Sequence, residues 1–245
     1  MSDHLRPAYA RPTRLSRWLI FFLVLNLLAA AVAVVTGFLA RLPLVQLRRG
    51  NASDAVISAV LETEFRHNLV SAIHGILGIV VAVLFLTWVY RVASNAHALA
   101  IKPMRFTPGA AVGWYFAPIF NLFRPYQAMF EIWSVSADPE APYRKRRSDA
   151  LALWWFLWLT TNFMFSVAIA IVMFSRKDDI GGLLVGNVFR LGGDALSIPL
   201  ALVIMRIVSR LNRLQAAYRE RQHSHAQEHE GEAVPPAANT NFARV

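Results

Sequence analysis

One stretch of the sequence decides the class of fold: ALALWWFLWLTTNFMFSVAIAIVMFS, at residues 150–175. It contains no charged residue, and it is longer than the roughly 20 residues that a helix needs to cross a hydrocarbon core about 30 Å thick. Trp154, Trp155 and Trp158 stand near its start, where aromatic residues of the membrane interface are usually found. The stretch therefore predicts a membrane-spanning helix.

Three further stretches have the length and composition of spanning helices. They are residues 18–40, 68–90 and 183–205, and the first two contain no Asp, Glu, Lys or Arg. The last is apolar overall but contains Arg190 and Asp194. The pattern predicts an all-α integral membrane protein with four transmembrane helices.

The composition of the whole chain agrees with this prediction. Its 245 residues are 56% hydrophobic and 16% charged, whereas soluble domains are about 25% charged. A soluble enzyme is therefore excluded as the default interpretation. The chain has no cysteine, which excludes disulfides, thiolate metal sites, iron–sulfur clusters and a cysteine nucleophile. We find no phosphate loop or hydrolase motif, so we predict no enzyme activity, cofactor or metal site.

The four spans divide the chain into three parts. We expect a basic tail at residues 1–17, a membrane domain at 18–214, and a polar, disordered tail at 215–245. The first span could instead be a secretory signal, because arginines precede it. Its apolar run exceeds the 7 to 15 residues of a signal sequence, so we predict an uncleaved anchor.

Lys and Arg residues predict the orientation, because positively charged loops resist translocation. If residues 106–136 do not cross the membrane, 18 of the 25 Lys and Arg residues fall on the cytoplasmic side. If this segment crosses, only 9 of them do. We therefore predict four spans, with both termini in the cytoplasm. The net charge of +10 is spread along one membrane face, which favours anionic lipid of the inner leaflet over nucleic acid as a partner.

Segment 106–136 is apolar but broken by prolines. Pro118 has no N–H and ends a helix, and the amide of Asn121 is placed to bond the freed backbone. The segment is predicted to be either a re-entrant hairpin or a strip at the inner interface. Arg124 can then reach lipid phosphates, and Pro125 suits the first turn of a new helix.

The new helix is predicted to be amphipathic and to lie on the inner leaflet. Apolar residues recur at i, i+3, i+4 and i+7, namely Tyr126, Met129, Phe130 and Trp133. The opposite face carries Gln127, Glu131 and Ser134.

Residues 113–133 read GWYFAPIFNLFRPYQAMFEIW and carry a specific pattern. The pattern resembles a bacterial family of multi-pass membrane proteins catalogued as domain of unknown function 4328. The matching residues are Gly113, Trp114, Pro118, Asn121, Leu122, Arg124, Pro125, Tyr126, Gln127 and Glu131. Phe120 stands where the family pattern has a small residue. The resemblance implies a multi-pass protein of a bacterial inner membrane, and it implies no activity.

The preferred functional hypothesis is a non-enzymatic membrane module that binds lipid headgroups or a protein partner through residues 113–133. Its candidate ligand site consists of Asn95, Trp114, Pro118, Asn121, Arg124, Pro125, Tyr126, Gln127 and Glu131. Four polar residues form the centre of this site: Asn95, Asn121, Arg124 and Glu131. A purely structural plug is the simpler interpretation of the same segment.

The alternative hypothesis is a small oligomeric transporter or channel that uses His74, Arg190 and Asp194. An ionisable residue inside a span is costly enough to suggest a function. Arg190 precedes Asp194 by one turn, so we expect the two to form an ion pair, which could also be merely structural. His74 lies among small residues and is expected to be a hydrogen-bonded residue of a helix interface.

Overall fold

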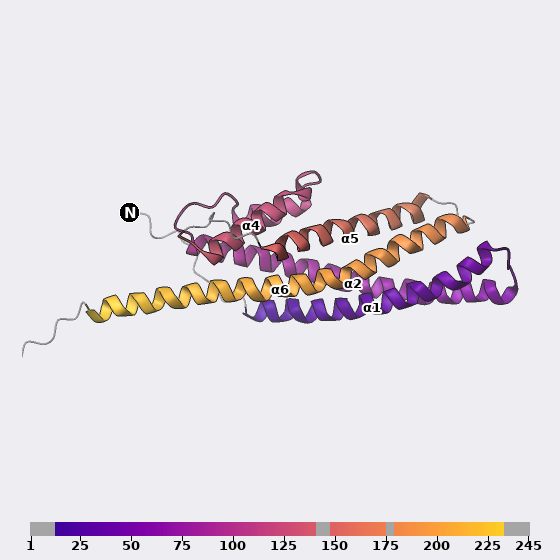
Figure 1. Cartoon of the computed structure of the whole chain (residues 1–245), viewed down its shortest axis with the longest axis horizontal. Helices are drawn as coiled ribbons and strands as arrows, with labels where there is room; N and C mark the ends of the chain where they lie inside the picture. Colours follow the sequence, from indigo (N-terminus) through magenta and orange to yellow (C-terminus); the bar gives the residue numbers. More distant parts are fainter. Residues whose placement is uncertain (1–12, 141–147, 175–178, 233–245) are drawn as a thin grey trace, which may run out of the picture.

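The computed structural model describes residues 13–140, 148–174 and 179–232, and the elements in this part of the chain are helices (Figure 1). Four of them are long and apolar enough to cross a membrane: α1 (Thr13–Arg48), α2 (Asp54–Leu99), α5 (Asp149–Phe174) and α6 (Ile180–Glu232). The predicted all-α membrane fold with four spans is confirmed. Helices α1, α2 and α6 extend beyond the predicted apolar stretches at both ends, whereas α5 nearly coincides with its stretch.

The four long helices alternate in direction, so the start of α1 and the end of α6 lie at the same end of the bundle (Figure 1). A short turn that contains Gly50, with a φ of 90°, joins α1 to α2. α1 packs along α2 and also along α6, and α5 packs along α6. Helices α2 and α5 therefore stand at the two edges of this series, with α1 and α6 between them.

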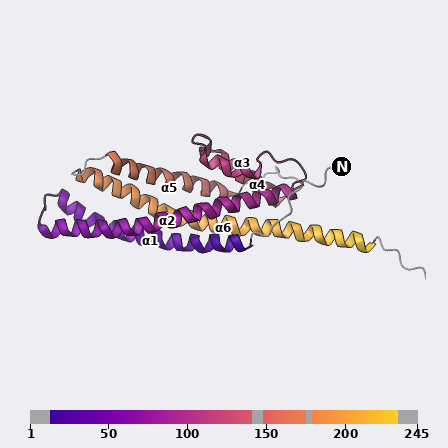
Figure 2. The same ribbon diagram turned by 180° about the vertical axis from the view of Figure 1, so that it is seen from behind.

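Between α2 and α5 the chain forms a hairpin of short helices, which Figure 2 shows from behind. They are α3 (Pro108–Gly113), η2 (Trp114–Phe116), η3 (Phe120–Leu122) and α4 (Arg124–Ala137). α3 and α4 contact each other, so the segment turns back and adds no fifth span. The helical backbone breaks at Ala117, which is extended (φ −92°, ψ 111°) because it precedes Pro118. Pro125 lies in the first turn of α4, as predicted.

The surface orientation predicted for α4 is wrong. Glu131 and Ser134, expected on a polar outer face, are 4% exposed, and only Gln127 of the predicted polar face is exposed. The Glu131 carboxylate accepts hydrogen bonds from the backbone N–H groups of Arg105 (2.7 Å) and Phe106 (3.0 Å). This partner segment is distant in sequence, so periodicity within α4 cannot reveal it. α4 is therefore an internal part of the bundle end.

The predicted start of a disordered tail at residue 215 is also wrong, because α6 continues as a helix to Glu232. Gln215 is fully buried, and its amide donates to the carbonyl of Val92 and to Ser136 Oγ, both at 2.9 Å. Asn95 donates to Gln215 Oε1 (3.2 Å). A glutamine normally indicates solvent exposure, but here α2 and α4 supply its partners. The remaining tail predictions, for residues 1–12 and 233–245, lie outside the described residues.

Candidate functional site

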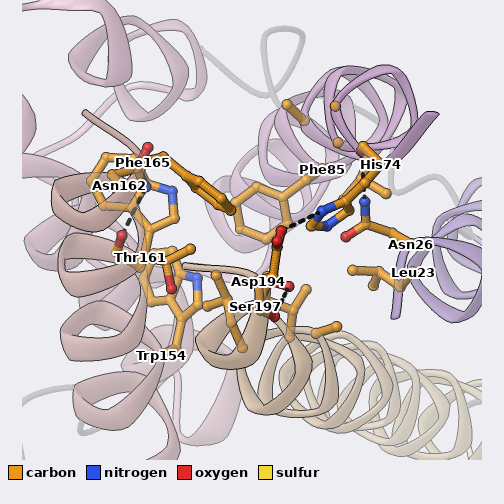
Figure 3. Close-up of a pocket in the computed structure, with 18 of the residues that line it drawn as sticks. Leu23, Asn26, His74, Phe85, Trp154, Thr161, Asn162, Phe165, Asp194 and Ser197 are labelled. Carbon is orange, nitrogen blue, oxygen red and sulfur yellow. Dashed lines mark hydrogen bonds and ion pairs between the residues drawn. The ribbon is translucent and has the colours of Figure 1, made fainter. Parts of the chain in front are cut away.

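A cleft of about 590 Å³ lies between α2 and α5, with α6 as its floor (Figure 3). The wall formed by α2 consists largely of small residues, including Gly75, Gly78 and Ala82. The facing wall on α5 is aromatic and includes Trp158 and Phe165. Small side chains on one wall make room, and large apolar side chains on the other provide contact area, as is usual in sites for apolar ligands.

The floor of the cleft is polar, because His74 of α2 meets Asp194 of α6 there (Figure 3). His74 Nδ1 donates to Asp194 Oδ1 at 3.0 Å, and the two residues are 8% and 1% exposed. Asn26 of α1 donates to the His74 carbonyl (3.3 Å), and Ser197 Oγ donates to the Asp194 carbonyl (2.7 Å). The expected hydrogen-bonded interface histidine is confirmed, and it joins three spans.

The prediction that Arg190 and Asp194 form an ion pair is wrong. Arg190 instead donates to Asn68 Oδ1 at 2.9 Å and lies 3.8 Å from Glu64 Oε2, both on α2. Side chains on a helix tilt toward its N-terminus, so Arg190 reaches away from Asp194, which follows it by one turn. His74, Arg190 and Asp194 nevertheless all line the same cleft. The structure thus brings the three residues to one cleft, but Asp194 pairs with His74 and not with Arg190.

Several buried polar atoms of the residues that line the cleft have no hydrogen-bond partner among the described residues. They are Asp194 Oδ2, Ser71 Oγ, Thr161 Oγ1, Trp154 Nε1 and the hydroxyl of Tyr115. Burial raises the pKa of Tyr115, which lies outside the spanning helices, so its hydroxyl stays protonated and remains a donor. An unsatisfied buried polar atom costs about 1–3 kcal/mol. These residues of the cleft therefore include both donors and acceptors whose hydrogen-bonding capacity the described residues leave unused.

The second set of predicted site residues surrounds Arg124, at the hairpin. The Arg124 guanidinium carbon lies 5.5–5.9 Å from the centres of four aromatic rings: Trp114, Phe120, Phe123 and Phe106. Rings at this distance attract a cation through their electron-rich faces. Its Nη1 also donates to Gln127 Oε1 at 3.4 Å. Arg124 is thus held in an aromatic cage, with its Nε buried and unpartnered within the described structure.

Two of the four polar residues proposed as the centre of a ligand site form hydrogen bonds with groups outside that set. Asn95 bonds to Gln215, and Glu131 bonds to the backbone at residues 105 and 106. The carbonyl of Leu122, in the broken segment, accepts a hydrogen bond from Trp155 Nε1 of α5 (3.2 Å). Asn121 was expected to provide such a bond, and its buried Oδ1 has no partner among the described residues. The hairpin therefore packs against α2, α6 and α5, and Trp155 adds a hydrogen bond from α5 to its broken segment.

Comparison with family descriptions gives a match to the family described as Domain of unknown function (DUF4328), over residues 53–213. This match covers most of the chain. The chain belongs to the DUF4328 family. The match begins just before α2 and ends within α6, so α1 lies outside it. Comparisons with curated proteins and with solved structures give no match.

The DUF4328 region contains nearly the whole cleft, since among the lining residues only Leu23 and Asn26 of α1 lie outside it. Sequence reasoning did not assign Asn26, Ser71, Thr161 or Ser197 to a site. Each is a polar residue within an apolar span, and that was the available signal. A position within a span does not show which of these residues face one another, so the cleft itself could not be predicted.

Proposed function

We propose that this DUF4328 protein is a non-enzymatic membrane module that binds an amphiphilic lipid in the cleft between α2 and α5. The observation that carries the proposal is Asp194 Oδ2, a buried and unpartnered acceptor at the floor of a largely apolar cleft. In this arrangement the headgroup meets the polar floor, and an acyl chain lies along the aromatic wall of α5.

The distribution of side chains supports a lipid over a small polar solute. Polar groups gather near His74 and Asp194, while most of the lining is apolar. Ligand pockets commonly combine such apolar walls with a few polar groups that fix orientation. A charged group within a span is also costly, which favours a role for Asp194 beyond helix packing.

The hairpin is assigned a supporting role in this proposal. Tyr115 lines one end of the cleft, so the hairpin borders the proposed lipid site. At the turn of the hairpin, Phe116 and Ile119 are 73% and 72% exposed, and such apolar side chains suit insertion among lipids. Arg124, which follows them in the sequence, suits contact with anionic headgroups.

The test is to purify the full chain in mild detergent and to identify the retained lipid by native mass spectrometry. Gly75 lines the cleft, and a Cβ added there meets no atom within 4 Å, so Gly75→Phe fills the cleft without a backbone clash. We expect this variant to lose the bound lipid. Asp194→Asn keeps the shape of the floor but removes its charge, and should retain about tenfold less lipid because it loses a charge-assisted contact.

The matched control is Ile76→Phe, which places the same ring on the neighbouring residue of α2, where the side chain is 63% exposed. It should retain lipid like the unmodified protein. If Gly75→Phe and Asp194→Asn both retain as much lipid as the control, the cleft is not the binding site.

A further inference from the structure

The cleft continues into a second cleft, which extends toward the end of the bundle where α5 ends and α6 begins. This second cleft has a volume of about 570 Å³ and shares Phe165, Ile169 and Arg190 with the first. Its lining on α2 begins at Glu64, and the lining of the first cleft on α2 reaches Phe85 and Leu86. At a rise of about 1.5 Å per residue, the stretch of α2 from Glu64 to Phe85 is about 30 Å long. That length equals the thickness of a hydrocarbon core.

The combined groove has a continuous lining of small and polar residues on two helices. On α2 they recur every three or four residues, at Glu64, Asn68, Ser71, Gly75, Gly78 and Ala82. On α6 the corresponding face carries Gly186, Arg190, Asp194, Ser197 and Ala201. Residues at this spacing share one face of a helix. The two faces form a track of small and polar residues, and α5 supplies a mostly apolar wall beside it.

The charges on this track have both signs. Glu64 and Asp194 are acidic, Arg190 is basic, and His74 bonds to Asp194; α5 contributes the uncharged Thr161 and Asn162. The Arg190 side chain is 25% exposed, and Asp194 follows it by one turn. A guanidinium suits a phosphate, and a carboxylate suits an ammonium group. The pair therefore fits a zwitterionic headgroup that has a phosphate and a primary amine.

We propose that the groove carries the headgroup of an aminophospholipid between the two leaflets of the membrane, a proposal that rests on lipid binding in the cleft. The headgroup moves along the track between α2 and α6, and the acyl chains remain in the bilayer beside α5. A charged headgroup crosses a hydrocarbon core slowly because it loses its hydration there. Polar side chains of α2 and α6 replace part of that hydration along one part of the groove, and Tyr115, Thr161 and Asn162 do so toward its other end.

The test reconstitutes the purified full chain into vesicles that contain a trace of phosphatidylethanolamine with a fluorophore on its acyl chain. A reductant that cannot cross the membrane quenches only the outer leaflet of protein-free vesicles. We expect both leaflets to be quenched when the protein is present. Phosphatidylglycerol labelled in the same way lacks the amine and should exchange about tenfold more slowly, since one charge-assisted contact is lost.

Gly75→Phe blocks the track, and should restrict quenching to the outer leaflet, while Ile76→Phe should behave as the unmodified protein. A second variant, Arg190→Gln, keeps a hydrogen-bonding side chain and should slow exchange about tenfold. Retained lipid in native mass spectra without exchange between leaflets overturns this inference and leaves lipid binding standing. Exchange that Gly75→Phe and Arg190→Gln leave unchanged also overturns it. Absence of both retained lipid and exchange overturns both proposals.

Discussion

At the scale of single residues, Gly193 determines how closely α6 approaches α5. A Cβ added at Gly193 would lie 2.7 Å from Phe165 Cε1 and 2.9 Å from Phe165 Cδ1, distances that real Cβ atoms do not tolerate. Phe165 also lines the cleft and lies 6.3 Å from the His74 ring, measured between ring centres. One methyl group at this position therefore affects both the helix contact and the shape of the cleft.

We expect Gly193→Ala to lower the stability of the protein by about 1–3 kcal/mol, as overpacking of a close contact usually does. The measurement is thermal unfolding of the purified protein in detergent. Gly192→Ala is the matched control, since a Cβ there meets Met164 Sδ at an ordinary 3.5 Å. Equal stability of the two variants would show that the α5–α6 contact adjusts freely.

At the scale of elements, the hairpin of α3, η2, η3 and α4 depends on bonds from neighbouring helices. Trp155 Nε1 bonds to the Leu122 carbonyl, and the Trp155 ring stacks on Trp158 with 4.9 Å between centres. A broken helix needs such partners, because free backbone groups are costly in an apolar environment. Pro118 therefore sets the position of the break, while α5 makes the break tolerable.

Trp155→Phe should loosen the hairpin, because it keeps an aromatic ring but removes the donor to Leu122. We expect faster amide hydrogen exchange over residues 119–123, measured by mass spectrometry. Trp154→Phe is the comparison, since the Trp154 Nε1 has no hydrogen-bond partner among the described residues. Similar exchange in both variants would argue against a role for the Trp155 bond.

At the scale of the whole molecule, the alternating helices place the α1–α2 turn opposite the end of α6 (Figure 1). The chain has no cysteine, so a single introduced cysteine reports its own side of the membrane. In intact cells we expect an impermeant maleimide to label Asn51→Cys and not Arg221→Cys, because positively charged segments remain in the cytoplasm. Labelling of both sites, or only of Arg221→Cys, would contradict this topology.

The sequence by itself determined the properties that depend on neighbouring residues along the chain. Apolar length predicted four spans, and the missing N–H of Pro118 predicted the broken helix, because both effects are local. The start of α4 at Arg124, beside Pro125, was predicted for the same reason. These features hold whichever way the helices pack.

Only the tertiary structure decided which buried polar groups meet. Asp194 bonds to His74, which is 120 residues away in the sequence, and not to Arg190 on its own helix. Gln215 is buried because Asn95 and Ser136 reach it from α2 and α4. Periodicity shows which face of a helix a residue occupies, but the packing of that face selects its partner. The cleft arises in the same way, because α2 and α5 stand apart with α1 and α6 between them.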